Sequence, residues 1–204
     1  MSIRRVTAAL FSGVLLIPVA AFSQEIGVKA GINLASLPPE EDENPDIPPR
    51  LGPVAGVWIR ATRDGRLSFQ AEGLFSEKGT HWKFSPEVTT EIRIRYLEFP
   101  LLARAGVGAS TAAGVYVIGG VAPAFKLSAR AWGECFGQGF SRAAGRDVEP
   151  FDFGLIGGLG VALGRGQIEA RYTHGALRIN TDDNEPNDRL NNRVFSVTAG
   201  FRVW

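Results

Sequence analysis

The chain is short of the features that define many familiar protein classes. Its single cysteine, Cys135, cannot form an internal disulfide, and no second cysteine is present for a metal knuckle or redox pair. Its 22 basic and 21 acidic residues nearly cancel, so no basic excess indicates nucleic acid as a partner. Beyond the first 23 residues, no run of 18 apolar residues provides a membrane-spanning helix. Stability must therefore come from packing and hydrogen bonds alone.

Residues 1–23 have the pattern of a cleaved secretory signal peptide. Arg4 and Arg5 are followed by an apolar run over residues 10–20 and then by small residues suited to a signal peptidase. A transmembrane anchor would need about 20 apolar residues, and this run is shorter. We therefore predict secretion through the inner membrane and one mature domain, residues 24–204.

The mature chain is rich in glycine and alternates in hydropathy with period two. The chain has 25 glycines, and from Glu25 to Ala35 five consecutive apolar residues alternate with polar or small ones, as in a β-strand. Two tight turns, one with Asp64-Gly65 and one with Gly164-Arg165-Gly166, favour hairpins. Seven further segments of this kind follow at residues 51–62, 67–78, 91–105, 115–128, 151–163, 167–179 and 193–204.

The links between these segments are alternately long and polar, then short. Outer-membrane barrels have this arrangement, with long external loops and short periplasmic turns. The apolar faces carry bulky Phe, Leu, Ile and Val, whereas the polar faces carry charges between Gly and Ala. We predict an all-β fold, an eight-stranded antiparallel up-and-down transmembrane β-barrel with its apolar face toward lipid. The alternative is a soluble periplasmic lipocalin-like barrel that binds a small apolar ligand inside.

In the membrane barrel, the charged residues of the polar faces point into the lumen. They carry both signs and can form ion pairs in a structural network. Eight strands leave an interior that side chains fill, so no open pore is expected. Lys78 and Gln70 share the polar face, and we expect Glu98 to pair with Arg60, Arg104 or Lys126. The predicted lumenal charge network is Lys29, Arg60, Glu72, Glu98, Arg104, Lys126, Asp152, Glu169, Arg171 and Arg202.

The stretch Tyr96 to Leu102, YLEFPLL, is the least regular strand. Arg93 and Arg95 share the phase of Leu97 and Phe99, so the pattern slips near Tyr96. A β-bulge there, or a position of residues 91–95 above the bilayer, would explain the slip. Pro100 also favours a bulge or a local break in pairing.

Several segments together resemble one known family. They are GVKAGIN (27–33), GVWIRATRDGRLSFQAEGLFSEKG (56–79), YLEFPLL (96–102), DFGLIGGLG (152–160), EARYTHGAL (169–177) and NRVFSVTAGFRVW (192–204). On these segments the mature chain resembles the PorT-like outer-membrane β-barrel family of Gram-negative envelopes. The resemblance implies the same barrel over nearly the whole mature chain. One departure is that Val203 has the outward phase of the last strand, while the terminal aromatic, Trp204, lies one residue beyond it.

Outside the lumen, the segment 129–150 is predicted to be the longest loop. Its Trp132, Cys135 and Phe136 are the predicted partner-facing residues, although they could equally fold over the barrel mouth. Tyr116, Tyr172, Trp82 and Trp204 are assigned to interfacial aromatic belts. The acidic segments 40–46 and 182–188 could offer oxygen ligands to a cation, but neither has EF-hand spacing. No metal site and no cofactor are therefore expected.

A lipid-modifying outer-membrane enzyme is the lesser alternative. His81 and His174 are the only histidines, and neither lies in a GxSxG or HExxH motif. We therefore expect no catalytic residues and a structural, anchoring or loop-mediated binding role. The expected partners are outer-membrane lipid and lipopolysaccharide, the barrel-insertion machinery and an unidentified surface or envelope protein. The protein itself is expected to be a monomer.

Overall fold

A computed structural model describes eight segments of the chain. They are residues 23–36, 49–62, 66–85, 88–107, 113–135, 138–143, 149–176 and 193–204. No helix in these segments is long and apolar enough to cross a membrane. The strands are β1 (Ser23–Ser36), β2 (Arg50–Thr62), β3 (Leu67–Ser85), β4 (Val88–Glu98), β5 (Leu101–Val107), β6 (Ala113–Cys135), β7 (Gln138–Ala143), β8 (Phe151–Leu163), β9 (Gly166–Gly175) and β10 (Arg193–Arg202).

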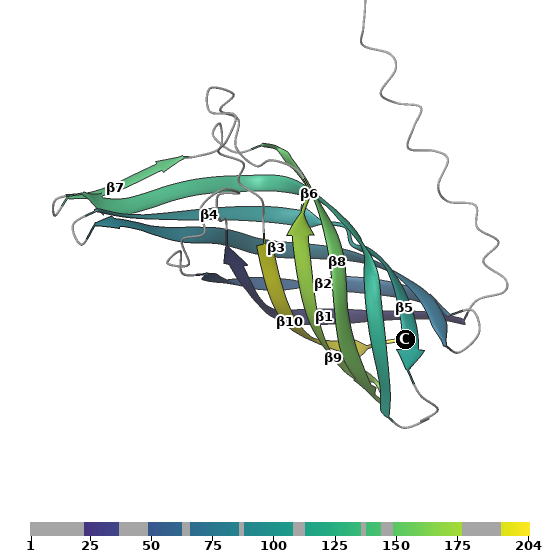
Figure 1. Cartoon of the computed structure of the whole chain (residues 1–204). Coiled ribbons are helices and arrows are strands. Elements are labelled where there is room, and N and C mark those ends of the chain that lie inside the picture. Colours follow the sequence, from purple (N-terminus) through teal and green to yellow (C-terminus); the bar gives the residue numbers. More distant parts are fainter. Residues whose placement is uncertain are drawn as a thin grey trace, which may run out of the picture.

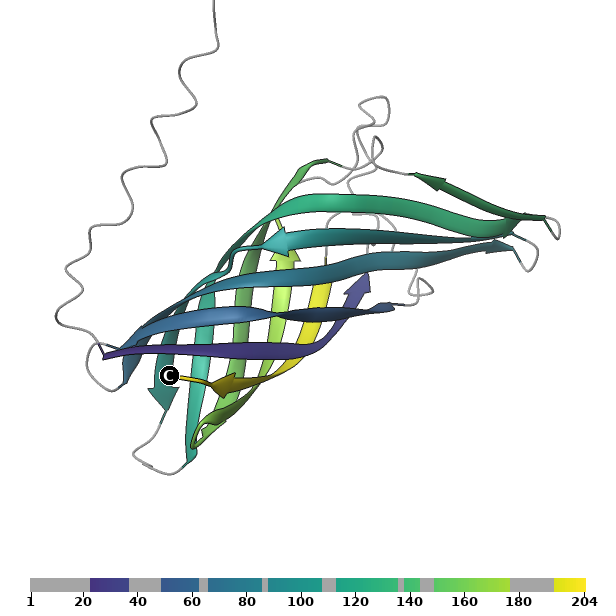
Figure 2. The same ribbon diagram turned by 180° about the vertical axis from the view of Figure 1, so that it is seen from behind.

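The strands close into one antiparallel barrel (Figures 1 and 2). Each strand of the wall pairs with its neighbours, and β1 pairs with both β2 and β10, which closes the ring. β4 and β5 are two parts of one wall strand, interrupted at Phe99 and Pro100, and both pair with β3 and β6. β7 pairs with β6 outside this ring. The wall therefore has eight strands, and the predicted fold class is confirmed.

The two faces of the wall differ in chemistry as a membrane barrel requires. Leu97, Phe99 and Leu101 are 38%, 40% and 53% exposed on the outside, whereas Lys29 and Glu169 are buried inside. The other strands repeat this alternation, with large apolar side chains exposed along the outer face. A soluble barrel would place these residues inside, so the lipocalin-like alternative is not favoured.

One end of the barrel carries the short links and both ends of the barrel sequence. The β2–β3, β5–β6 and β8–β9 connections lie here, and Gly164 supplies a positive φ of 58° in the last of them. The chain end is tied to β1, because the Ile26 amide donates to the Trp204 carbonyl at 2.8 Å. Short turns mark the periplasmic end of outer-membrane barrels, so we expect the opposite end of this barrel to be external.

At the external end, strands replace part of two predicted loops. β3 continues to Ser85, and β6 continues to Cys135 before it turns back as β7. The expectations of a link between the strands at 67–78 and 91–105 and of a loop over 129–150 were therefore wrong over these strands. In both ribbon views, β3, β4, β6 and β7 project beyond the other strands (Figures 1 and 2). We call this part of the sheet the external extension, comprising residues 77–85, 88–95, 128–135 and 138–143.

The predicted irregularity near Tyr96 is confirmed. The register between β4 and β6 shifts between Arg95, opposite Ser128, and Tyr96, opposite Lys126. Leu127 is therefore the extra residue, and the bulge belongs to β6 rather than to β4. Pro100, which has no backbone N–H, lies in the break between β4 and β5.

Candidate functional site: the lumenal ion-pair network

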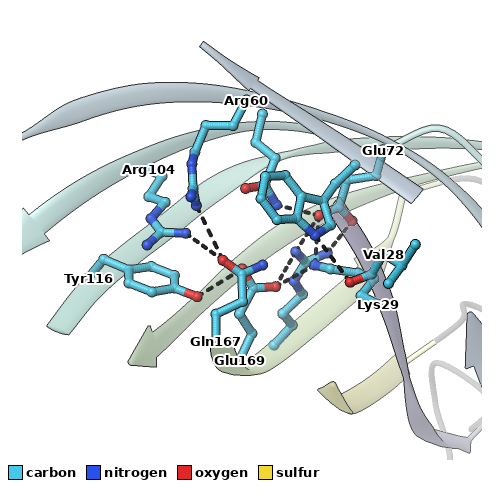
Figure 3. A network of polar contacts seen from close by, with 11 residues as sticks. Val28, Lys29, Arg60, Glu72, Arg104, Tyr116, Gln167 and Glu169 are labelled. Carbon is cyan, nitrogen blue, oxygen red and sulfur yellow. Dashed lines mark hydrogen bonds and ion pairs between the residues drawn. The ribbon is translucent and has the colours of Figure 1, made fainter. Parts of the chain in front are cut away.

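Four charged residues meet at the centre of the lumen, which we call the central cluster: Lys29, Glu72, Glu169 and Arg171. The Lys29 Nζ lies 2.8 Å from Glu72 Oε1 and 2.5 Å from Glu169 Oε2 (Figure 3). Arg171 donates from Nη1 and Nη2 to the two carboxylate oxygens of Glu72, each at 2.7 Å. All four are buried and their charges balance, so each charge taken from water has a partner.

The central cluster spans the barrel from one side to the other. Glu72 lies on β3 and Arg171 on β9, and these are four positions apart in the ring of eight wall strands. A direct bidentate contact between opposite walls leaves the lumen filled at this level. The predicted structural role of these charges thus has a concrete geometry.

A tyrosine on β6 is hydrogen-bonded to the central cluster. The Tyr116 hydroxyl donates to Glu169 Oε1 at 3.0 Å, and the Arg104 guanidinium lies 3.3 Å from the tyrosine ring centre (Figure 3). The ring fits because Gly160 lies beside it, where an added Cβ would come within 2.4 Å of a ring atom. Tyr116 is 1% exposed, so its assignment to an interfacial belt was wrong.

Below the central cluster, the lumen holds a basic cavity of about 300 Å³ at the end with the short turns. Arg60 and Arg104 both donate to Gln167 Oε1, at 3.2 and 2.9 Å. Arg60 also donates from Nε to Glu25 Oε2 at 2.7 Å, and Arg202 pairs with the same carboxylate. The cavity and its rim therefore carry more positive than negative charge.

Above the central cluster, Lys78 supplies the base for two carboxylates. Its Nζ lies 2.6 Å from Glu98 Oε1 and 3.8 Å from Asp152 Oδ2. Glu98 therefore pairs with Lys78, which was not among the bases expected for it. Lys78 lies four residues along β3 from Leu74, the residue opposite Glu98, and its long side chain reaches the carboxylate within the lumen.

The predicted network residues occupy different depths. Lys29, Arg60, Glu72, Glu98, Asp152, Glu169 and Arg171 are buried, whereas Arg104, Lys126 and Arg202 are half-buried. Sequence reasoning left out Glu25 and Gln167, although Glu25 has the phase of Lys29 and Gln167 that of Glu169. The alternation of each strand was therefore enough to place Glu25 and Gln167 on the inward face.

The other sequence candidates are only partly described. Trp132 lies in β6 rather than in a loop and donates from Nε1 to Glu91 Oε2 at 3.1 Å. Phe136 and the side chain of Cys135 lie outside the described residues, as do residues 1–22, the acidic segments 40–46 and 182–188, and the side chains of His81 and Trp82. Within the described residues, no group of three His, Cys, Asp or Glu side chains is arranged to hold a metal.

Comparison with one solved structure supports the same architecture. The chain is similar to Neisserial surface protein A, with a TM-score of 0.50 and 12% identity over 88% of this chain and 99% of that chain. It is also similar to Ail of Yersinia pestis, with a TM-score of 0.43 and 14% identity over 88% and 99% of the two chains. For OprG of Pseudomonas aeruginosa, the TM-score is 0.48 and the identity 11%, over 89% and 96%. At these identities the likeness concerns the fold alone.

No curated protein sequence matches the chain. The profile of the outer membrane protein beta-barrel domain family, in contrast, matches residues 22–178, which is more than half of the sequence. This agrees with an apolar outer face, a charged lumen and a ring of eight antiparallel strands. The chain therefore belongs to the outer membrane protein beta-barrel domain family and is an integral outer-membrane β-barrel protein.

Proposed function

We propose that the protein is a non-conducting outer-membrane anchor that holds the external extension above the membrane as a binding surface. The observation that carries the proposal is the central cluster, in which Arg171 and Glu72 join opposite walls of the barrel. A lumen crossed by buried, mutually bonded side chains offers no continuous path for hydrated ions. The external extension, by contrast, offers a second surface that is free of the membrane.

Conductance across a planar bilayer tests the anchor role. The purified protein should insert without producing stepwise current. A variant with Lys29→Ala, Glu72→Ala, Glu169→Ala and Arg171→Ala, which removes all four charges of the central cluster, should conduct if it still folds. Heat-modifiable migration on gels reports the folding. Stepwise channels from the unmodified protein would overturn the proposal.

We place the protein in the PorT-like branch of the family, on the segments quoted above. The N-terminal 23 residues are proposed to be a signal peptide that is removed on export, leaving residues 24–204. N-terminal sequencing of the protein from outer membranes should begin at Gln24. A chain that retains Arg4 and Arg5 would contradict this.

We propose a non-enzymatic role. His174 stacks against Tyr172 on the outer face of β9, with ring centres 6.5 Å apart, and the backbone of His81 lies on β3, which does not pair with β9. A shared catalytic site would need both histidines beside a nucleophile. Lipid-modification activity that is lost on replacing both histidines would refute the proposal.

The proposed partners are outer-membrane lipid and lipopolysaccharide, the barrel-insertion machinery, and an unidentified envelope or surface protein that contacts the monomer near Trp132, Cys135 and Phe136. Trp132 supports a partner-facing surface because it lies on the external extension, half-buried beside exposed residues. A pull-down with and without residues 129–150 tests the protein partner. Identical recoveries from both would contradict the proposal.

A further inference from the structure

The outer face of the external extension carries arginines directly above the apolar band. On β4, Arg93 and Arg95 have the same phase as Leu97 and Phe99 and therefore lie on the face that meets lipid lower down. Phe99, Phe125 and Phe151 form edge-to-face contacts in that band, with ring centres 6.2 and 5.3 Å apart. At about 3.3 Å per residue, Arg95 and Arg93 stand roughly 7 to 13 Å beyond Leu97 along the strand. If the apolar band ends near Leu97, we expect lipid headgroups at this level.

β6 adds another arginine to the same face. The register places Arg130 directly opposite Arg93, and Ser128 opposite Arg95. Two like charges facing each other across strands are unfavourable unless an anion lies between them or nearby. Arg130 is exposed, and none of the described residues forms an ion pair with it.

These side chains surround a hollow of about 130 Å³ on the surface. Its lining consists of three guanidinium groups, two hydroxyls and one indole: Arg93, Arg95, Arg130, Ser128, Ser141 and Trp132. The Arg93 guanidinium lies 4.4 Å from the Trp132 ring centre, which holds its plane in a defined orientation. Arginine forks and hydroxyl donors are the groups that bind phosphate oxygens.

The acidic side chains that the structure describes nearby do not neutralise this site. Glu77 pairs with Arg50, Arg93 and Arg95, and Glu91 pairs with Arg50 and Arg93. With Arg130, four arginines share two carboxylates among the side chains of this face that the structure describes. Their positive charge is complementary to the charge of a phosphate group.

We propose that this hollow binds a phosphate of an anionic glycolipid headgroup in the outer leaflet. The position of the hollow indicates that the phosphate belongs to a lipid. The acyl chains of such a lipid would lie along the apolar band around Phe99 and Phe125, while its phosphorylated sugar reaches the arginines. The inference rests on the proposed external position of the extension. It gives the proposed lipid partner a site on the external extension, and this site includes Trp132, which is also proposed above to contact a protein partner.

The test is binding of diphosphoryl lipid A to the full-length mature protein in detergent micelles, followed by microscale thermophoresis. The variant is Arg93→Gln with Arg130→Gln, and the matched control is Arg165→Gln, an exposed arginine in the β8–β9 turn. The double variant should bind at least about tenfold more weakly, because two charge-assisted contacts are lost. The control should bind like the unmodified protein, and added salt should weaken binding.

Two further experiments identify the origin of the bound phosphate and control for misfolding. Dephosphorylated lipid A and inorganic phosphate alone should each bind at least about tenfold more weakly than the intact lipid, and equal binding of either would overturn the proposal. Arg130→Glu alone, at an exposed site, should reduce binding without changing heat-modifiable migration. Unchanged lipid binding in this variant would also refute the site. Surface biotinylation of Ser141→Cys in a Cys135→Ser background, in whole cells, tests the external position separately. Labelling is expected, and its absence in intact cells would overturn the external position.

Discussion

Removal of Lys29 tests whether the central cluster is held together by charge balance. Lys29→Met keeps most of the side-chain volume but leaves Glu72 and Glu169 with Arg171 as their remaining base in the cluster. One buried negative charge is then uncompensated, and breaking a buried pair in this way costs about 3 to 5 kcal/mol of unfolding free energy. Glu72→Gln alone should cost a similar amount, because it leaves one positive charge in excess.

The double variant, Lys29→Met with Glu72→Gln, restores the balance, since Arg171 and Glu169 remain paired at 2.5 Å. It should therefore be less destabilised than the sum of the two single variants, by about 2 kcal/mol or more. Urea unfolding in lipid vesicles, followed by tryptophan fluorescence, measures all three, with Arg165→Gln as a surface control. A single variant that loses less than about 1 kcal/mol, or strictly additive losses, would refute charge balance as the source of stability.

Three further predictions concern other parts of the barrel. Gly160→Val should cost about 1 to 3 kcal/mol of unfolding free energy, because its Cβ would lie 2.4 Å from the Tyr116 ring; a cost near zero in urea titration would show that the ring moves freely. Leu159→Arg, midway along the lipid face of β8, should destabilise the folded state in vesicles by about 2 to 4 kcal/mol. Leu163→Arg, near the turn, should cost about 0 to 1 kcal/mol. Equal costs for the two variants would contradict the membrane placement. Burial raises the pKa of Glu77, but hydrogen bonds from neighbouring arginines outweigh burial and lower the pKa from its usual 4.5. The stability that Glu77 contributes should therefore be fully present above pH 4.5 and fall as the pH drops below it. Urea titrations at several pH values should show a weaker loss of stability at low pH for Glu77→Gln.

The membrane-spanning part of the wall was predictable because two different surroundings act on alternate residues. Lipid outside and a polar lumen inside impose period two on each strand, as in Phe151 to Leu163. The short turns were equally visible through Asp64-Gly65 and Gly164. Strand number, order and orientation follow from these two signals.

The parts of the external extension in β3, β6 and β7 were missed because that signal ends with the membrane. In β7 the sequence QGFSRA has no apolar face, so the hydrogen-bonded pairing of Gln138–Ala143 with β6 leaves no hydropathy pattern. The partner of Glu98 was also beyond sequence reasoning. Alternation along one strand tells which residues face inward, but it does not tell which carboxylate a long side chain such as Lys78 reaches inside the lumen.

The bulge at Leu127 connects the lipid-facing band with the arginine site. Below it, Phe125 and Leu127 face outward; above it, Ser128 and Arg130 do, while Ala129 and Ala131 pack inward against Ile94. An uninterrupted alternation from Phe125 would instead turn Ala129 and Ala131 outward and bury Arg130 beside that apolar cluster, at the cost of an unpaired buried charge. A strand that is apolar on its outer face within the membrane can therefore present arginine on the same face above it only if one residue is inserted, and Leu127 is that residue.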